Sequence, residues 1–366
     1  MSTDPRRAPA TYAGAGVDTT AAGHALAGLL RWVAETGSNR PGSIRLPNGY
    51  FAAVLAISPN LGLAISTDGV GTKLLVAEQL QKYDTVGIDC VAMNVNDVLC
   101  VGAEPVALVD YLAVEGADAQ LLEAVGRGLH EGARQARVTI PGGELAIVPE
   151  LIRGQGHGPA FDLVGTAVGT VALDRLLDGS TIADGDVVVG LASSGIHSNG
   201  LTLARRVLVG DDPRRLAEYV PELGRTLGEE LLEPTRIYVQ PVLAMLRADL
   251  PIHALAHITG DGLFNLTRAA APVSFRLDRL PPSVPPIFSL IQERGQVPLA
   301  EMYRVFNMGV GYCVVVAPDG VEAVLATAAE HGVAAWHLGH ARADGQRRVE
   351  LPQVCLVGER GEFRRA

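Results

Sequence analysis

The sequence predicts an α/β protein made of two domains. Segments with strand character alternate with segments of helical periodicity along most of the chain, and this alternation is typical of α/β packing. The length of 366 residues exceeds what a single domain usually reaches. With 48% hydrophobic and 19% charged residues, the composition is that of an ordinary globular protein.

Composition also disfavours several classes of function. The net charge of −10 argues against a nucleic-acid-binding surface, which needs a basic stripe. No apolar run approaches the roughly 18 residues of a membrane helix, so no membrane partner is expected. The four cysteines show no Cys-x-x-Cys spacing, which favours a reducing cytoplasm over zinc sites or disulfides. The polar start of the chain has no apolar core after it and predicts a disordered tail, not a signal peptide.

The first half is expected to hold one helix and then mixed strands and helices. Residues 18–36 predict the first helix, because Leu26, Leu29, Leu30 and Val33 repeat at helical spacing before Gly37. Strands are predicted at 61–66, 105–114, 136–141 and 161–173, and helices at 73–82, 85–101 and 118–137. We place the domain boundaries at 1–15 for the tail, 16–174 for the first domain and 175–366 for the second.

The second half opens with a buried strand at 187–191 and a helix at 201–209. A charged connection at 213–234 precedes a helix predicted at 235–250, which Pro241 is expected to bend. Later strands are predicted at 252–257, 310–317 and 334–339, with a helix at 319–331.

A glycine-rich motif follows the strand predicted at 61–66. It runs Asp68-Gly69-Val70-Gly71-Thr72-Lys73. Its glycines allow backbone N–H groups to approach a phosphate closely, and Lys73 adds positive charge. It is neither the common P-loop nor a dinucleotide fingerprint, because the required glycine spacings are absent. Taken alone, such a motif is also typical of a simple turn.

The helix predicted at 85–101 adds a second acidic group. Its apolar stripe consists of Ile88, Val91, Ala92, Val95 and Leu99. Asp89 and Asn96 lie beside this stripe and Asp97 lies further round. Asp68 and Asp97 are hard oxygen donors, and Mg²⁺ commonly binds through one or two carboxylates plus phosphate oxygens. Together the two segments favour a nucleotide–metal site over a turn and a solvated helix.

Three further segments carry candidate site residues. His197 lies between a strand and a helix, in Ser194-Gly195-Ile196-His197-Ser198-Asn199-Gly200. A helix N-terminus there favours an anion, so His197 predicts either a substrate or phosphate contact or a histidine hydrogen-bonded within a turn. Glu144 follows Gly142-Gly143 and predicts either a metal or ATP contact or a turn carboxylate. His257 before Thr259 could contact substrate or be structural. No nucleophilic triad or cysteine is indicated, so the chemistry must come from ATP, metal and positioning.

These motifs resemble the superfamily of aminoimidazole ribonucleotide synthetase (phosphoribosylformylglycinamidine cyclo-ligase), selenophosphate synthetase and thiamine monophosphate kinase. The superfamily mark is Asp-x4-Gly-Ala-x-Pro at 97–105. His-Ser-Asn-Gly at 197–200 and Pro-Thr-Arg-Ile-Tyr at 234–238 are specific to the cyclo-ligase branch, which the chain resembles over nearly its whole length. Supporting motifs are Ala15-Gly16-Val17-Asp18, Tyr83 to Asp89, His257 to Gly260 and Phe306 to Gly311.

The resemblance implies a fold and an activity. The fold is a two-domain aminoimidazole ribonucleotide synthetase-like α/β (α+β) fold, in which the N-terminal strands pair with those of a second subunit to close a β-barrel. The implied enzyme is a homodimeric ATP-dependent cyclo-ligase of purine biosynthesis that uses Mg²⁺. It cyclises formylglycinamidine ribonucleotide, a phosphorylated small molecule, to aminoimidazole ribonucleotide through an iminophosphate.

The resemblance also implies roles for residues. Catalytic roles fall on Asp97, Lys73 and His197. ATP contacts fall on Asp68, Gly69, Val70, Gly71, Thr72, Lys73, Gly142, Gly143 and Glu144. Substrate contacts fall on Ser194, His197, Ser198, Asn199 and Thr259. Metal ligands are Asp68, Asp97 and Glu144.

The sequence departs from the family's pattern around the substrate half of the site. The differing positions include Tyr50, Ala52, Leu145, Ile147 and Asp261. Tyr50 and Ala52 replace glycines and restrict close backbone approach. Ile147 removes a carboxylate, and Asp261 adds one where a phosphate is expected. Two alternatives therefore stay open: a diverged paralogue that uses ATP to activate another small molecule, and a catalytically silent nucleotide-binding relative.

Overall fold

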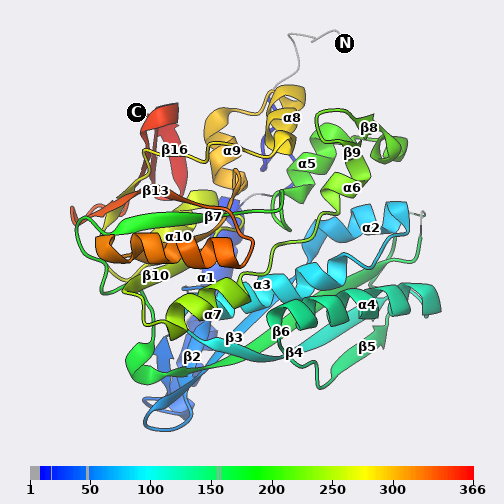
Figure 1. Ribbon diagram of the computed structural model, residues 1–366. Helices are drawn as coiled ribbons and strands as arrows, with labels where there is room; N and C mark the ends of the chain where they lie inside the picture. The colour runs from blue at the N-terminus through cyan, green and yellow to red at the C-terminus, as the bar shows by residue number, and fades with distance from the viewer. Residues whose placement is uncertain (1–8, 18, 47–48, 155, 157) are drawn as a thin grey trace.

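Two mixed β-sheets with helices packed against them make up the chain (Figure 1). The computed structural model describes residues 9–17, 19–46, 49–154, 156 and 158–366. The two-domain α/β prediction is confirmed at this level. The predictions for tail residues 1–8 and for Asp18 of the N-terminal motif lie outside the described residues. None of the helices in the described ranges combines the length and the hydropathy needed to cross a bilayer.

The first sheet has six strands in the order β1-β2-β3-β6-β4-β5. Their bounds are β1 Ile44–Leu46, β2 Ala53–Ala56, β3 Leu61–Gly69, β4 Glu104–Val114, β5 Gly143–Ile147 and β6 Phe161–Ala172. The helices of this half are α1 Thr19–Glu35, α2 Leu74–Leu80, α3 Val86–Cys100 and α4 Ala119–Ala136. In β6, residues alternate between buried and half-buried, as expected for a strand with only one covered face.

Helix α3 lies between this sheet and α4 (Figure 1). Glycines make the close packing possible. A Cβ on Gly128 of α4 would lie 2.2 Å from the backbone oxygen of Asp84, and one on Gly87 of α3 would lie 2.3 Å from the backbone nitrogen of Leu129. Four of the five residues of the predicted apolar stripe are fully buried, and Ile88 is the exception. This packing fixes the position of Asp97, which is carried by α3.

The other face of the first sheet has α1 over its β2–β3 side, across a cavity, but no covering layer over β4 and β5 within the described chain. Val109 and Tyr111 of β4 are each 44% exposed, whereas their neighbours Leu108 and Leu112 face the helices and are buried. The six-stranded sheet is open, so the predicted barrel does not form within the described part of one chain.

The second sheet has eight strands in the order β10-β12-β7-β13-β11-β14-β15-β16. Their bounds are β7 Val187–Ala192, β10 Ile252–His257, β11 Ser274–Arg276, β12 Val310–Val316, β13 Ala335–Arg342, β14 Val349–Leu351, β15 Leu356–Glu359 and β16 Glu362–Arg365. The helices are α5 Leu201–Leu208, α6 Leu227–Leu231, α7 Val239–Arg247, α8 Pro286–Gly295, α9 Leu299–Val305 and α10 Val321–Glu330, and a small ribbon pairs β8 Tyr219–Val220 with β9 Arg225–Thr226. Every residue of β12 is buried, as expected of a central strand with both faces covered.

One predicted strand is absent, and one predicted helix is shorter than expected and not bent. The strand predicted at 136–141 is absent: α4 continues to Ala136, Thr139 forms only an isolated bridge with Ala107, and the strand begins at Gly143. The helix predicted at 235–250 spans only Val239–Arg247. Pro241 therefore lies in its first turn, where the N–H that proline lacks would have had no intrahelical partner, and it does not bend the helix.

Candidate functional site

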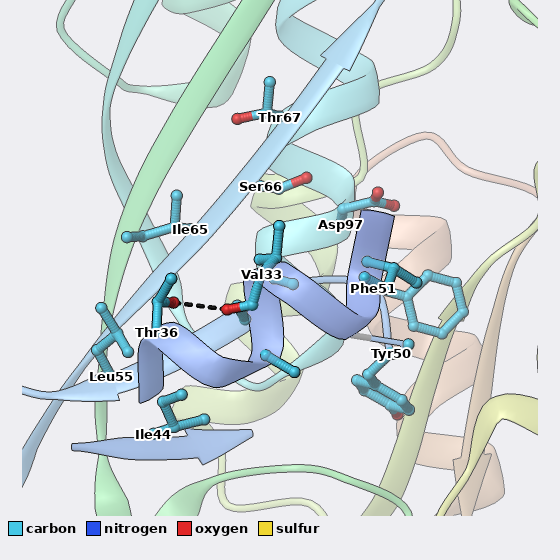
Figure 2. Close-up of a pocket in the computed structure, with 15 residues that line it drawn as sticks. Val33, Thr36, Ile44, Tyr50, Phe51, Leu55, Ile65, Ser66, Thr67 and Asp97 are labelled. Carbon is cyan, nitrogen blue, oxygen red and sulfur yellow. Dashed lines mark hydrogen bonds between the residues drawn. The ribbon is translucent and has the colours of Figure 1, made fainter. Parts of the chain in front are cut away.

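The candidate site begins where β3 extends past its neighbour β2. The register pairs Ala53, the first residue of β2, with Ile65, so Ser66 to Gly69 have a strand on only one side. The first two residues of the segment predicted as a phosphate loop, Asp68 and Gly69, are thus the end of a strand. Beside it lies a cavity of about 690 Å³, bordered by α1, by Tyr50 and Phe51, and by Asp97 at one end (Figure 2).

Asp68 and Asp97 meet at this strand end. Gly165 pairs with Asp68, and a Cβ on Gly165 would touch Asn94 and Cys90 of α3, so Asp68 projects from the helix-covered face. The backbone N–H of Gly69 donates to Asp68 Oδ1 at 2.8 Å. Burial raises the pKa of Asp68 to about 6, and the nearby charge of Asp97 adds to the shift. The structure therefore brings the two predicted metal ligands together in a partly desolvated place.

His257, at the end of β10, holds Asp97 from the second domain. Its ring is fully buried, and its Nδ1 lies 2.9 Å from Asp97 Oδ1. Asp97 itself keeps 16% of its side chain exposed. The contact fixes one carboxylate oxygen of Asp97 across the boundary between the two sheets.

Lys73 lies in the interior, where sequence reasoning did not place it. Its side chain and that of Asp89 are both fully buried, and Lys73 Nζ lies 2.9 Å and 2.8 Å from the two carboxylate oxygens of Asp89. The ammonium also donates to the backbone oxygens of His197 and Glu233. Lys73 thus ties α3 to two loops of the second domain.

Asp89 completes this network with segment 233–238. It accepts hydrogen bonds from Ser198 Oγ at 3.0 Å and from the backbone N–H and hydroxyl of Thr235, each at 2.7 Å. Asn96 adds a further link, because its amide nitrogen donates to the backbone oxygen of Arg236 at 2.9 Å. The Pro-Thr-Arg-Ile-Tyr motif therefore holds the second domain against α3 through buried hydrogen bonds to Asp89 and Asn96.

His197 is a buried, neutral imidazole in the turn before α5. Its backbone has a left-handed φ of 65°, and the backbone N–H of Ser194 donates to its Nε2 at 3.1 Å. Burial, reinforced by the charges of His257, Lys73 and Arg236, holds its pKa well below the usual range. Because Nε2 accepts, Nδ1 must carry the proton, and this buried N–H has no partner in the described structure.

The other predicted substrate residues divide into two groups. Ser194 and Ser198 are occupied by the scaffold, since Ser194 Oγ donates to the backbone oxygen of Pro234 at 2.6 Å and Ser198 Oγ donates to Asp89. Asn199 is different: its buried side-chain nitrogen has no hydrogen-bond partner in the described structure. It lies against the turn that begins at Thr259, because its Oδ1 is 3.4 Å from where a Cβ of Gly260 would be.

The predicted ATP-binding residues 69–72 form the end of β3 and a short turn. The backbone N–H of Val70 donates to the backbone oxygen of Leu163 at 3.0 Å. Gly71 has a φ of +72°, a conformation that favours glycine. The Thr72 hydroxyl lies 3.0 Å from that of Thr202. The turn therefore joins the strand end to α5 of the second domain.

Glu144 lies apart from the Asp68–Asp97 pair. The register aligns it with Tyr111, on the uncovered face of the sheet, and β5 is three strands away from β3. Three strand spacings amount to about 14 Å. Gly142, Gly143 and Glu144 of one chain are therefore not brought to the same place as Asp68. Among the described residues, no group of three or more Asp, Glu, His or Cys side chains is arranged to hold a metal ion.

Comparison with known proteins shows the family. Residues 49–171 match AIR synthase related protein, N-terminal domain, and residues 183–352 match AIR synthase related protein, C-terminal domain. The chain is 52% identical over 277 residues to phosphoribosylformylglycinamidine cyclo-ligase of Methanothermobacter thermautotrophicus, covering 76% of this chain and 79% of that one. The chain belongs to the phosphoribosylformylglycinamidine cyclo-ligase family. The cyclo-ligase of Pyrococcus furiosus is 50% identical over 317 residues, covering 86% of this chain and 90% of that one.

Solved structures with low identity share the fold of this cyclo-ligase family member. Hydrogenase maturation protein HypE in complex with ATP matches with a TM-score of 0.57 and 19% identity, over 81% of this chain and 83% of that one. Thermotoga maritima PurL complexed with AMPPCP matches with a TM-score of 0.54 and 18% identity, over 84% of this chain but 44% of the longer PurL chain.

Two residues that depart from the family's pattern, Tyr50 and Asp261, have neighbouring partners that accommodate them. Tyr50 is packed edge-on against Phe51, and its hydroxyl donates to the backbone oxygen of Leu255 at 3.3 Å. The carboxylate of Asp261 is bonded by Arg268 Nη2 at 2.9 Å. The added negative charge is thereby neutralised by a neighbouring cation.

Proposed function

We propose that this chain is an ATP-dependent cyclo-ligase that converts formylglycinamidine ribonucleotide to aminoimidazole ribonucleotide in purine biosynthesis. The observation that carries the proposal is the 50–52% identity to curated cyclo-ligases over most of the chain. The geometry agrees with it, because Asp97 of the acidic pair lines a cavity of about 690 Å³, within the size range of small-molecule sites. We place the protein in the cytoplasm, where this pathway operates.

The proposed reaction has two steps. ATP first phosphorylates the formyl amide oxygen, which gives an iminophosphate and ADP. The amidine-side nitrogen then attacks that carbon, the carbon–oxygen bond breaks, and inorganic phosphate leaves as the imidazole ring closes. The protein's contribution is chiefly positioning and electrostatic stabilisation.

Asp68 and Asp97 fit the needs of Mg²⁺ in this reaction. They supply two neighbouring carboxylates, of which Asp97 lines the cavity, and Mg²⁺ prefers one or two carboxylates together with substrate phosphates and water over an all-protein cage. Mg²⁺ would neutralise charge on the transferred phosphoryl group. His257 fixes Asp97, and the Gly69 N–H fixes Asp68. The turn at 193–200 holds two buried donors without a partner in the described structure, Asn199 Nδ2 and His197 Nδ1–H, and we assign these to the substrate half.

The direct test is phosphate release from Mg-ATP, measured with and without formylglycinamidine ribonucleotide, together with mass detection of aminoimidazole ribonucleotide. Substrate-dependent phosphate release with the imidazole product would establish the activity. Nucleotide binding without either result would instead support one of the two open alternatives, a paralogue with another substrate or a silent relative.

We infer that the uncovered face of the first sheet pairs with a second copy of the chain. Val109 and Tyr111 leave an apolar sheet face open to solvent, and such a face usually marks an interface. Glu144 shares this face, so its part in the site would be played where the two copies meet. A homodimer would also supply the strands needed to close the implied barrel.

Tyr111→Lys should convert the dimer to monomer. An unpaired ammonium buried in this interface would cost about 3 kcal/mol, or about a hundredfold in the dissociation constant. Light scattering at micromolar concentration measures the mass directly. The matched control is Tyr219→Lys, because Tyr219 is 64% exposed on β8 and should leave the mass unchanged. A monomeric wild-type protein would contradict the proposed dimer.

Mg²⁺-dependent nucleotide binding should weaken below about pH 6. Asp68 has its pKa raised to about 6, so the proton competes with the metal for this carboxylate below that pH. The sign for stability is opposite: the raised pKa destabilises the metal-free fold as the pH rises from about 4 to about 6. Calorimetric titration of Mg-ATP between pH 5 and 7 tests the prediction. Affinity in Asp68→Asn should be low and independent of pH over this range.

A further inference from the structure

We propose that Arg268 binds the phosphate group of the substrate. The inference rests on the proposed function, because it names the group that recognises the anionic end of a ribonucleotide. Arg268 ends the short helical segment Gly262–Arg268, which directly follows the Thr259–Asp261 turn.

The first step of the argument is that a phosphate needs a cation that the acidic pair and its cavity do not offer. None of the fifteen described residues that line the cavity is Lys, Arg or His. Lys73 is fully buried against Asp89, and His197 is held neutral. The cation that binds the substrate's phosphate must therefore come from a neighbouring element.

Arg268 is a cation outside the cavity lining that contacts one of the lining residues. Its guanidinium carbon lies 5.0 Å from the ring centroid of Phe51, which is one of the residues that line the cavity (Figure 2). Stacking on an aromatic ring orients the planar guanidinium without using its N–H donors. Phe51 therefore links Arg268 to the cavity, one side chain away from the space that the substrate would occupy.

Arg268 also has donors to spare. It has five N–H groups, and its hydrogen bond in the described structure is the one from Nη2 to Asp261 Oδ2 at 2.9 Å. Its side chain is 31% exposed. Arg304 also interacts electrostatically with Asp261. It differs from Arg268 because its guanidinium already donates to both carboxylate oxygens of Glu301. Arg268 is thus oriented but not saturated, as expected of a residue that binds a phosphate through a fork of donors.

Asn199 is a second residue with an unpartnered donor in the described structure, and it lies against the same turn. The buried side-chain nitrogen of Asn199 has no partner in the described structure, and Asn199 contacts the position of Gly260. A buried donor without a partner is costly unless a ligand or water satisfies it. Asn199 lies against Gly260 and Arg268 is bonded to Asp261, so both side chains contact the turn at 259–261, and we assign both donors to an anion bound there.

Asp261 has two opposing effects on Arg268. Its carboxylate holds Arg268 in place, but it also competes with a phosphate for the same cation. Removing only the charge should therefore tighten phosphate binding, whereas removing the guanidinium should weaken it.

The test compares formylglycinamidine ribonucleotide with its dephosphorylated ribonucleoside. Arg268→Met should raise the KM for the ribonucleotide by about 50-fold and change the KM for ATP by less than about twofold. For the ribonucleoside, wild type and Arg268→Met should have equal kcat/KM. Arg268→Lys keeps the charge but loses the fork, so its KM should rise by about fivefold. Asp261→Asn should lower the ribonucleotide KM by about threefold.

Arg175→Met is the matched control, because Arg175 also pairs with a single aspartate, Asp249, on an exposed surface. It should leave every constant unchanged. If Arg268→Met impairs the ribonucleoside as much as the ribonucleotide, Arg268 has a structural role and the proposal is wrong. Calorimetry with ribose 5-phosphate needs no turnover. Binding by wild type but not by Arg268→Met would support the phosphate site even if cyclo-ligase activity failed, and equal binding by both would overturn it.

Discussion

Asp97→Asn should abolish ATP-dependent turnover while leaving the protein folded. The substitution removes a charge next to Asp68 but keeps an oxygen that can accept from His257 Nδ1, now 2.9 Å from Asp97 Oδ1. The fold should therefore persist, because the link between α3 and β10 is retained. Loss of the charge should cost about 4 kcal/mol of transition-state stabilisation, or about a thousandfold in kcat.

The measurement is steady-state phosphate release with saturating Mg-ATP and substrate, together with a thermal melt. Asp249→Asn is the matched control, because this aspartate is 70% exposed and has no assigned role in the site. The control variant should retain full activity. A fully active Asp97→Asn enzyme would remove Asp97 from the metal site. A variant that melts far below wild type would show instead that the Asp97–His257 contact is chiefly structural.

The sequence predicted the meeting of Asp68 and Asp97 because both lie at the ends of regular elements. The apolar stripe of α3 fixes which side of that helix packs inward, and the apolar run of β3 fixes where the strand must lie. What the pattern missed is that β3 continues through Gly69. Its pairing with Val164 of β6 is a tertiary contact, and glycine-rich residues carry no strand signal of their own.

The wrong elements have similar causes. Val138, Thr139 and Ile140 favour a strand locally, yet they form only a connection, because the place beside β4 is taken mainly by 143–147. The helices α8 and α9 were not predicted, since each is short and begins directly after a proline-containing segment with little periodic signal. Short elements depend on tertiary packing more than on their own propensity.

The site's interior was the least predictable part. Lys73 looks like a phosphate-binding lysine in sequence because it follows a glycine-rich motif. Its partners are Asp89, sixteen residues away, and the backbone oxygens of His197 and Glu233, which are more than a hundred residues away. No local spacing encodes contacts of that range.

Lys73→Met should therefore destabilise the protein strongly. Removing one partner of a buried ion pair leaves the other charge uncompensated, and the expected loss is about 3–5 kcal/mol in the free energy of unfolding. Asp89 would keep its hydrogen bonds from Ser198 and Thr235, which offset only part of the lost ammonium. Adding Asp89→Asn to Lys73→Met should recover part of the stability, because the amide removes the buried charge while keeping an acceptor for Thr235.

Urea denaturation of wild type and the two variants measures the free energy of unfolding. Lys82→Met serves as the control, because Lys82 is 47% exposed and its ion pair with Asp84 should add little to the stability. The result separates two roles for one residue. A Lys73→Met protein of normal stability, with a greatly raised KM for ATP, would place the ammonium at the nucleotide phosphates. The opposite result is a loss of stability in Lys73→Met that Asp89→Asn partly restores. A phosphate-binding role alone cannot produce that recovery. This second result would assign Lys73 to the buried network that holds the backbone of His197 and Glu233 in place.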